Sequence, residues 1–142
     1  MIILSTDVFN LSRFVRAQYC YNEVKKELLN GEKRSHWMWF IFPQLDGLGG
    51  SYMSALYSIK NKEEALAYFN HELLGPRLVE LCNILLSLDT NNATEIFGFT
   101  DSLKLKSSMT LFLLSTQEQI FKNVLDKFFD GVLCDYTIQS IA

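Results

Sequence analysis

The chain is poor in the residues that build disulfide scaffolds and metal sites. Its 142 residues include three cysteines, Cys20, Cys82 and Cys134, which lie far apart and form no CxxC pair. An odd number of widely spaced cysteines argues against a disulfide framework, and two histidines are too few for a usual structural zinc site. We therefore expect three reduced thiols, no bound metal and no cofactor, as in a cytoplasmic protein.

A long hydrophobic run is also lacking. A helix that spans a bilayer needs roughly 18–20 apolar residues, and no stretch of this chain approaches that length. Residues 1–4 are apolar, but they are too few for a signal sequence, and Asp7 soon follows them. We expect no membrane association and a cytoplasmic location.

Positive charge is not in excess. Thirteen Lys and Arg residues against sixteen Asp and Glu residues give a formal net charge of −3. This balance argues against general nucleic-acid binding, which depends on a broad basic surface. The phosphate loop GxxxxGKS/T, the HExxH and GxSxG motifs and a calcium loop are absent as well, so no familiar motif identifies a reaction.

The apolar residues and the breaks between them predict helices. Two prolines and seven glycines are few, and 49% of the residues are hydrophobic, enough for one continuous core. Helical spacing predicts helices over about 7–30, from Asn61, after 75–76, from 101 or 102 to about 115, and over 120–129, with one or two turns in 135–141. We predict one all-α domain over residues 1–142, a compact orthogonal bundle of about six to eight helices.

Residues 37–42 are apolar on every side and must be buried. A short run of this kind is either a buried strand or a buried short helix. Ser35 as a cap and Pro43 as a stop favour the helix, because the residue before a proline is pushed out of the helical region. The glycine-rich residues 47–51 then form either a turn in which Ser51 caps the next helix or a weak phosphate-cradling loop.

Charged and polar side chains flank this aromatic run. Lys33 and Arg34 could contact an anion, while Trp37 and Trp39 either stack on a flat ring such as a nucleobase or belong to the core. His36 is either an acid–base group or a hydrogen-bonded structural histidine. The candidate binding residues of this segment are Lys33, Arg34, Trp37, Trp39, Gln44 and Ser51.

A second polar cluster follows from residue 101. On a helix, Asp101, Lys104, Ser107 and Ser108 fall within an arc of about 120°. A lysine with two hydroxyls one turn away can hold an anion, and Asp101 could orient the lysine or act as an acid or base. The alternative is a solvated helix face with an i,i+3 ion pair.

Two further polar residues have simpler expected roles. Gln18 lies on the apolar stripe of the first predicted helix, so it is either a hydrogen-bond hub of the core or a ligand contact. His71 is expected to cap the C-terminus of the helix that precedes it, where a cation is favoured.

Five motifs resemble one bacterial family: GEKRSHWMWFIFPQ, GLGGS, EEALAYFNHELLGPRL, IFGFTDSLKLKSSMTLF and VLDKFFDG. Together they are similar to the family called domain of unknown function 1810, sometimes labelled calpastatin-like, over about residues 9–138. The resemblance implies a compact all-α domain and brings no known reaction. It also implies that polar residues recur at the family positions Gln18, Lys33, Arg34, His36, Gln44, Ser51, His71, Arg77, Asp101, Lys104, Ser107 and Ser108.

Three functions are therefore open. The first is a cytoplasmic protein that binds a small anionic, phosphate-bearing and nucleotide-like ligand between residues 33–51 and 101–110. The second is a hydrolase or glycosidase on a nucleotide-derived substrate, with His36 or Asp101 as the acid–base group. The third is a protein-interaction module without a small-molecule site, for which a flat apolar surface would be the sign.

Overall fold

Helices account for nearly all the regular structure of this protein. The computed structural model describes residues 7–141, so the apolar residues 1–4 lie outside the described part. The α-helices are α1 Ser12–Ala17, α2 Tyr21–Leu29, α3 Met38–Ile41, α4 Tyr52–Leu56, α5 Lys62–Asn70, α6 Leu74–Ser87, α7 Ala93–Phe97, α8 Phe99–Thr116, α9 Gln119–Phe129 and α10 Asp135–Ser140. A 3-10 turn, Gln18–Cys20, joins α1 to α2. The prediction of an all-α fold is confirmed.

Seven of these helices have six residues or more, within the range expected, and α3, α4 and α7 are shorter. Two predicted caps are confirmed: the Asn61 side chain accepts a hydrogen bond from a backbone N–H of α5, and Ser51 does the same for α4. The helix expected after residues 75–76 begins earlier, at Leu74. Pro76 fits there because the first turn of a helix leaves backbone N–H groups without intrahelical partners.

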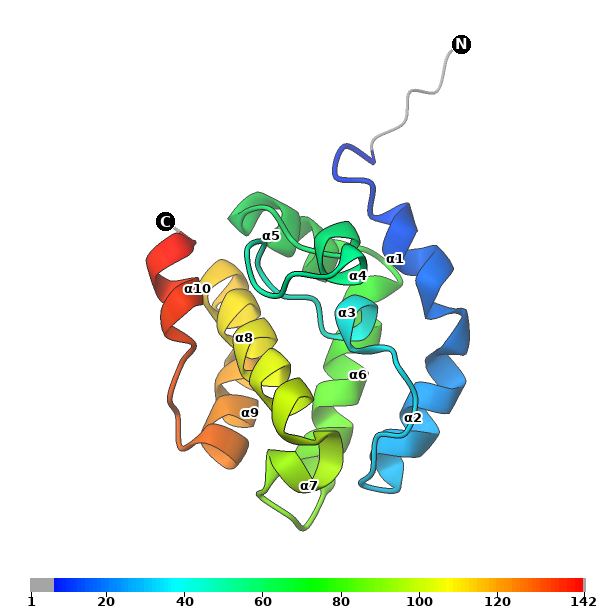
Figure 1. The fold of residues 1–142 in the computed structure, drawn as a ribbon, viewed down its shortest axis with the longest axis vertical. Helices are drawn as coiled ribbons and strands as arrows, with labels where there is room; N and C mark the ends of the chain where they lie inside the picture. The colour runs from blue at the N-terminus through cyan, green and yellow to red at the C-terminus, as the bar shows by residue number, and fades with distance from the viewer. Residues whose placement is uncertain (1–6, 142) are drawn as a thin grey trace.

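Helix α8 runs across the front of the molecule and contacts α5, α7, α9 and α10 (Figure 1). Helix α6 passes behind it and contacts α2, α5 and α9. Helices α1 and α2 lie on one side of the molecule, and α9 and α10 lie on the other. The segment from α3 to α4 crosses the same face as α8, so the two predicted site segments share one side of the bundle.

One hydrophobic core joins most of these elements. It includes Phe14 of α1, Leu28 of α2, Leu85 of α6, Phe112 of α8 and Phe121 of α9, each fully buried. The long helices α6 and α8 bury apolar side chains on more than one face, which removes apolar area from water. A chain with 49% hydrophobic residues has enough apolar side chains for this.

The apolar run 37–42 forms the one-turn helix α3, and the helix reading is therefore confirmed. Trp37 and Phe42 at its ends are each only 1% exposed. The chain after α3 is held by a parallel bridge, in which Asp46 N–H donates to the Ile59 carbonyl and Ile59 N–H donates to the Gln44 carbonyl. These contacts tie residues 44–46 to Ile59, in the segment before α5.

No helix within residues 7–141 combines the length and the apolarity needed to cross a membrane.

Candidate functional site

The two predicted segments meet through an ion-paired triad. Lys33 Nζ lies 2.8 Å from Asp101 Oδ2, and Lys104 Nζ lies 3.3 Å from Asp101 Oδ1. The Lys33 side chain is 7% exposed, and those of Asp101 and Lys104 are 20% and 23% exposed. Residues 68 positions apart in the chain thus form one charged cluster. The predicted i,i+3 pair exists, but it is shielded from solvent on most sides.

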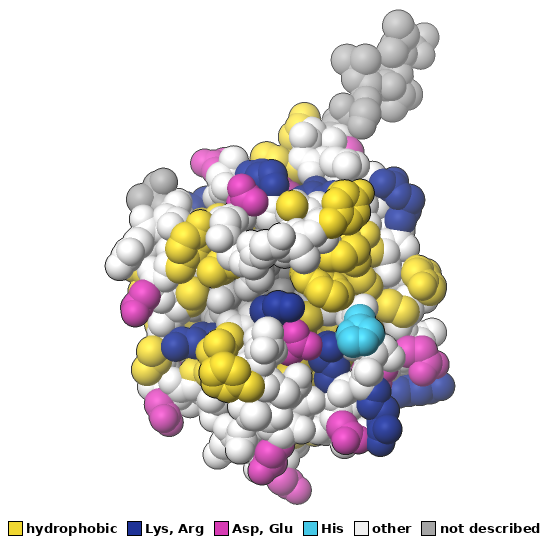
Figure 2. Space-filling view, viewed as in Figure 1, with side chains coloured by type: hydrophobic (Ala, Val, Ile, Leu, Met, Phe, Trp, Pro, Cys, Tyr) yellow, Lys and Arg dark blue, Asp and Glu magenta, His cyan; other side chains and the backbone are white. Residues whose placement is uncertain are grey.

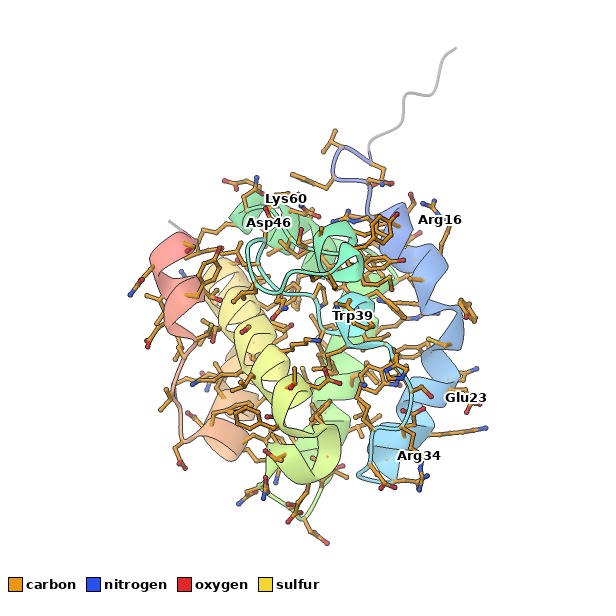
Figure 3. The ribbon with its side chains drawn as sticks, in the orientation of Figure 1. Arg16, Glu23, Arg34, Trp39, Asp46 and Lys60 are labelled. Carbon is orange, nitrogen blue, oxygen red and sulfur yellow. The ribbon has the colours of Figure 1, made fainter. Side chains whose placement is uncertain are left out.

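Each lysine of the triad also covers a tryptophan. Lys33 Nζ lies 5.0 Å from the ring centroid of Trp37, and Lys104 Nζ lies 4.9 Å from that of Trp39. A cation over an indole face is attracted by the negative charge of the ring face. The aromatic run therefore helps to position both ammonium groups. Figure 3 places Trp39 near the centre of this face.

A small cavity opens beside Lys104. Its volume is about 220 Å³, and it is lined by Gln44, Leu48, Gly49, Thr100, Leu103, Lys104 and Ser107. The first three residues come from the loop before α4, and the other four lie on one face of α8. Figure 2 shows a cation beside an acid between α8 and α3, with hydrophobic side chains on either side. Three residues of the predicted site, Gln44, Lys104 and Ser107, thus line one cavity.

Glu27 anchors the segment that carries Lys33. Its carboxylate accepts hydrogen bonds from the backbone N–H groups of Arg34 and Ser35, from the Ser35 hydroxyl and from the Trp37 indole N–H. Burial by itself would raise the pKa of Glu27, but these four donors outweigh it and hold the pKa at about 2. The segment is therefore tied to α2 at three positions, Arg34, Ser35 and Trp37.

Sequence reasoning missed Glu27 as a structural residue of the site. The available signal was its place on α2, three residues after Val24 and one before Leu28, both of which are fully buried. An acid on a buried helix face needs donors, and here the donors are the residues just before α3. A second anchor is the Lys33 backbone N–H, which donates to the Ile96 carbonyl of α7 at 2.7 Å.

Ser107 connects the cavity to a cysteine. Its hydroxyl lies 3.1 Å from the Leu103 carbonyl oxygen and 3.3 Å from Cys134 Sγ. Burial raises the pKa of the Cys134 thiol, but the Ser107 hydroxyl and the backbone N–H groups of Tyr136 and Thr137 leave it below its ordinary value. Ser108, the other predicted hydroxyl, is fully buried and does not line the cavity.

Several predicted site residues lie elsewhere. Arg34 is exposed, pairs with Glu32 at 2.7 Å, and lies near the end of α2, away from Trp39 (Figure 3). The His36 side chain is exposed and does not line the cavity. Trp37 is buried, so it has no free face for a ligand ring, and Ser51 is an exposed helix cap.

Gln18 is a hydrogen-bond hub of the core. Its side-chain amide donates to the Phe40 carbonyl at 2.8 Å and to the Tyr68 hydroxyl at 3.0 Å, and it accepts from the Arg77 guanidinium at 3.2 Å. The buried Gln18 side chain thereby joins α3, α5 and α6. Of the two roles open for Gln18, the structure shows the core role.

His71 is the C-cap residue of α5, as expected, and its backbone N–H donates to the Tyr68 carbonyl. Its side chain serves the next helix as well, because Nδ1 accepts hydrogen bonds from the backbone N–H groups of Leu73 and Leu74 at the start of α6. Within residues 7–141, no cluster of His, Cys, Asp and Glu is suited to hold a metal ion.

Comparisons with known proteins agree with this architecture. The crystal structure of Rv1873, a conserved hypothetical protein from Mycobacterium tuberculosis, is 47% identical in sequence and superimposes with a TM-score of 0.92, covering 94% of this chain and 96% of that one. A search of curated proteins found no match. The profile of a family described as a protein of unknown function (DUF1810) matches residues 8–141. The chain therefore belongs to the DUF1810 family, as its motifs indicated.

Proposed function

We propose that this chain is a cytoplasmic protein that binds a small anionic ligand in the cavity between the loop before α4 and α8. The observation that carries the proposal is that Lys104 lines this cavity. An ammonium has three N–H donors, and the ion pair with Asp101 uses one of them. The remaining donors can serve a carboxylate or phosphate oxygen.

The other lining groups suit such a ligand. Leu48 and Leu103 offer apolar walls, and Gln44 and Thr100 offer a side-chain amide and a hydroxyl. Pockets that bind small molecules commonly combine mostly apolar walls with a few placed polar groups. The volume of about 220 Å³ lies below the roughly 300–1,000 Å³ of drug-sized sites, so the ligand is an anionic head with a small body. A nucleotide would place only part of itself inside.

The arrangement favours binding over hydrolysis. Among the described residues, neither His36 nor Asp101 lines the cavity, and both Asp101 oxygens are engaged by lysines. A general acid or base must come within hydrogen-bond reach of the group that reacts. The role of Asp101 in this proposal is to orient Lys104.

A thermal-shift screen tests the proposal. The panel contains inorganic phosphate, small carboxylates, phosphate esters, nucleotides and ADP-ribose. A ligand at 100 times its dissociation constant adds about 2.7 kcal/mol of stability, which for a domain of this size raises Tm by roughly 6–10 °C. The Lys104→Ala variant should lose this shift, and the Lys122→Ala variant should keep it, because Lys122 is exposed and paired with Asp126 on α9. No shift with any anion, or a shift that Lys104→Ala leaves intact, would refute the proposed site.

A further inference from the structure

The charges around the cavity add up to a single positive charge. Lys33 and Lys104 are two cations, and Asp101 is the one anion that they share. Lys104 is the only charged side chain of residues 7–141 that lines the cavity. Asp46, in the loop before α4, pairs with Lys60, between α4 and α5, at a separation of 3.6 Å, so these two charges cancel (Figure 3).

We infer that the site selects a monoanion, a carboxylate on a small apolar body, over a phosphate ester, and that Asp101 sets this preference. The inference rests on the proposed function and names its ligand class. A carboxylate brings one negative charge, which the triad balances. A phosphate monoester carries about −1.5 to −2 charges at pH 7, so part of its charge would be unmatched beside the Asp101 carboxylate.

Because the triad is shielded from solvent, its net charge of +1 affects which anion binds. The side chains of Lys33, Asp101 and Lys104 are each less than a quarter exposed, so water and salt screen them less than they screen surface pairs. The hydrogen-bond donors of the cavity also favour a carboxylate over a phosphate. No arginine lines the cavity among the described residues, whereas bidentate recognition of phosphate commonly uses arginine.

The cavity walls specify the body of the ligand. Leu48 and Leu103 face a space of about 220 Å³, which admits one ring or a short branched chain. Apolar area removed from water there stabilises the complex, and the carboxylate then lies at Lys104. Benzoate and phenyl phosphate are suitable probes, because they share a ring and differ in the anionic head.

The test is calorimetric titration at pH 8.5, where phenylphosphonate is a dianion, with two ligand pairs. The first pair is benzoate and phenyl phosphate, and the second is phenylphosphonate and its monomethyl ester, which have the same tetrahedral head but different charge. The monoanion of each pair should bind about tenfold more tightly to the unmodified protein. The phosphonate pair requires no variant, so the inference can be judged even if substitutions prevent folding.

Variants then separate charge from shape. Asp101→Asn raises the local charge from +1 to +2 and should remove or reverse the preference for the monoanion. Adding Lys33→Met to Asp101→Asn returns the local charge to +1 and should restore the preference. Asp126→Asn is the matched control, because Asp126 also pairs with a lysine within one helix, and it should leave the ratio of affinities unchanged.

The outcomes are distinguishable. If no probe of either pair binds and no anion in the thermal screen does, the proposed function and this inference both fail. If the dianions bind as tightly as the monoanions or more tightly, the binding site stands and the monoanion inference is overturned. If Asp101→Asn folds and leaves the ratio unchanged, Asp101 does not set the preference.

Discussion

Glu27→Gln is the most informative single change outside the cavity. The carboxylate of Glu27 accepts four hydrogen bonds from the segment that carries Lys33, and glutamine has the same shape but only one acceptor oxygen. The pKa of Glu27 in the folded protein is about 2, against an ordinary value of 4.5. At 1.36 kcal/mol per pKa unit, this shift corresponds to about 2–3 kcal/mol of stability once partial solvent screening is allowed for.

The sign of the pH dependence follows from the direction of this shift. A carboxyl whose pKa is lowered by folding stabilises the protein above its unfolded-state pKa, and the stabilisation is lost as the pH falls toward the folded-state pKa. The contribution of Glu27 should therefore be complete near neutral pH and should disappear between about pH 5 and pH 2. Glutamine does not titrate, so the variant should lack this part of the acid sensitivity.

Urea unfolding followed by tryptophan fluorescence measures the effect at pH 7 and at pH 3. We expect Glu27→Gln to lower the unfolding free energy by about 2–3 kcal/mol at pH 7 and by roughly 1 kcal/mol at pH 3. Glu23→Gln on the same helix is the control, because Glu23 is exposed and its pair with Lys26 contributes at most a few tenths of a kcal/mol. A deficit below about 0.5 kcal/mol at pH 7, or one of equal size at both pH values, would refute this account.

Three further substitutions test the packing. Gln18→Leu should lower the unfolding free energy by about 2–4 kcal/mol, measured by urea unfolding, because it leaves Tyr68 and other buried groups without partners; a neutral result would contradict the hub role. Gly75→Ala should lower Tm strongly, because a Cβ there would lie 1.8 Å from a carbonyl oxygen of α5, whereas Gly50→Ala meets open space and should be nearly neutral. Ser108→Ala should be neutral or stabilising by up to about 1 kcal/mol, because its buried hydroxyl has no hydrogen-bond partner in residues 7–141; loss of anion binding in this variant would instead assign Ser108 to the site.

The helices with clear apolar spacing were predictable. The leucines of α6 and the aromatic and aliphatic residues of α9 recur three and four apart, and the caps Asn61 and Ser51 are local signals that need no tertiary contact. Helix α7 was missed because five residues are too short for periodicity to appear. The early start of α6 was missed because residues 75–76 read as a break, although Gly75 is required by the close approach of α5.

The polar face of α8 was predictable for the same local reason. Asp101 and Lys104 lie one turn apart in any α-helix, and their ion pair follows from that spacing. Ser107 and Ser108 were assigned to the same arc, but the structure separates them: Ser107 lines the cavity and Ser108 is buried in the core. Adjacent helical residues point about 100° apart, so only the packing of the neighbours decides which one reaches a cavity.

The sequence by itself determined that the chain is helical, that residues 37–42 are buried and that a lysine and an aspartate share one face of α8. Only the tertiary structure decided which cation joins them. Lys33 and Arg34 were both expected to contact an anion, but the Arg34 backbone N–H is bound to Glu27 and its side chain turns to solvent, while Lys33 reaches Asp101. The physical reason is that helical periodicity acts over a few residues, whereas the triad depends on contacts between α2, α7 and α8 that only the packed bundle creates.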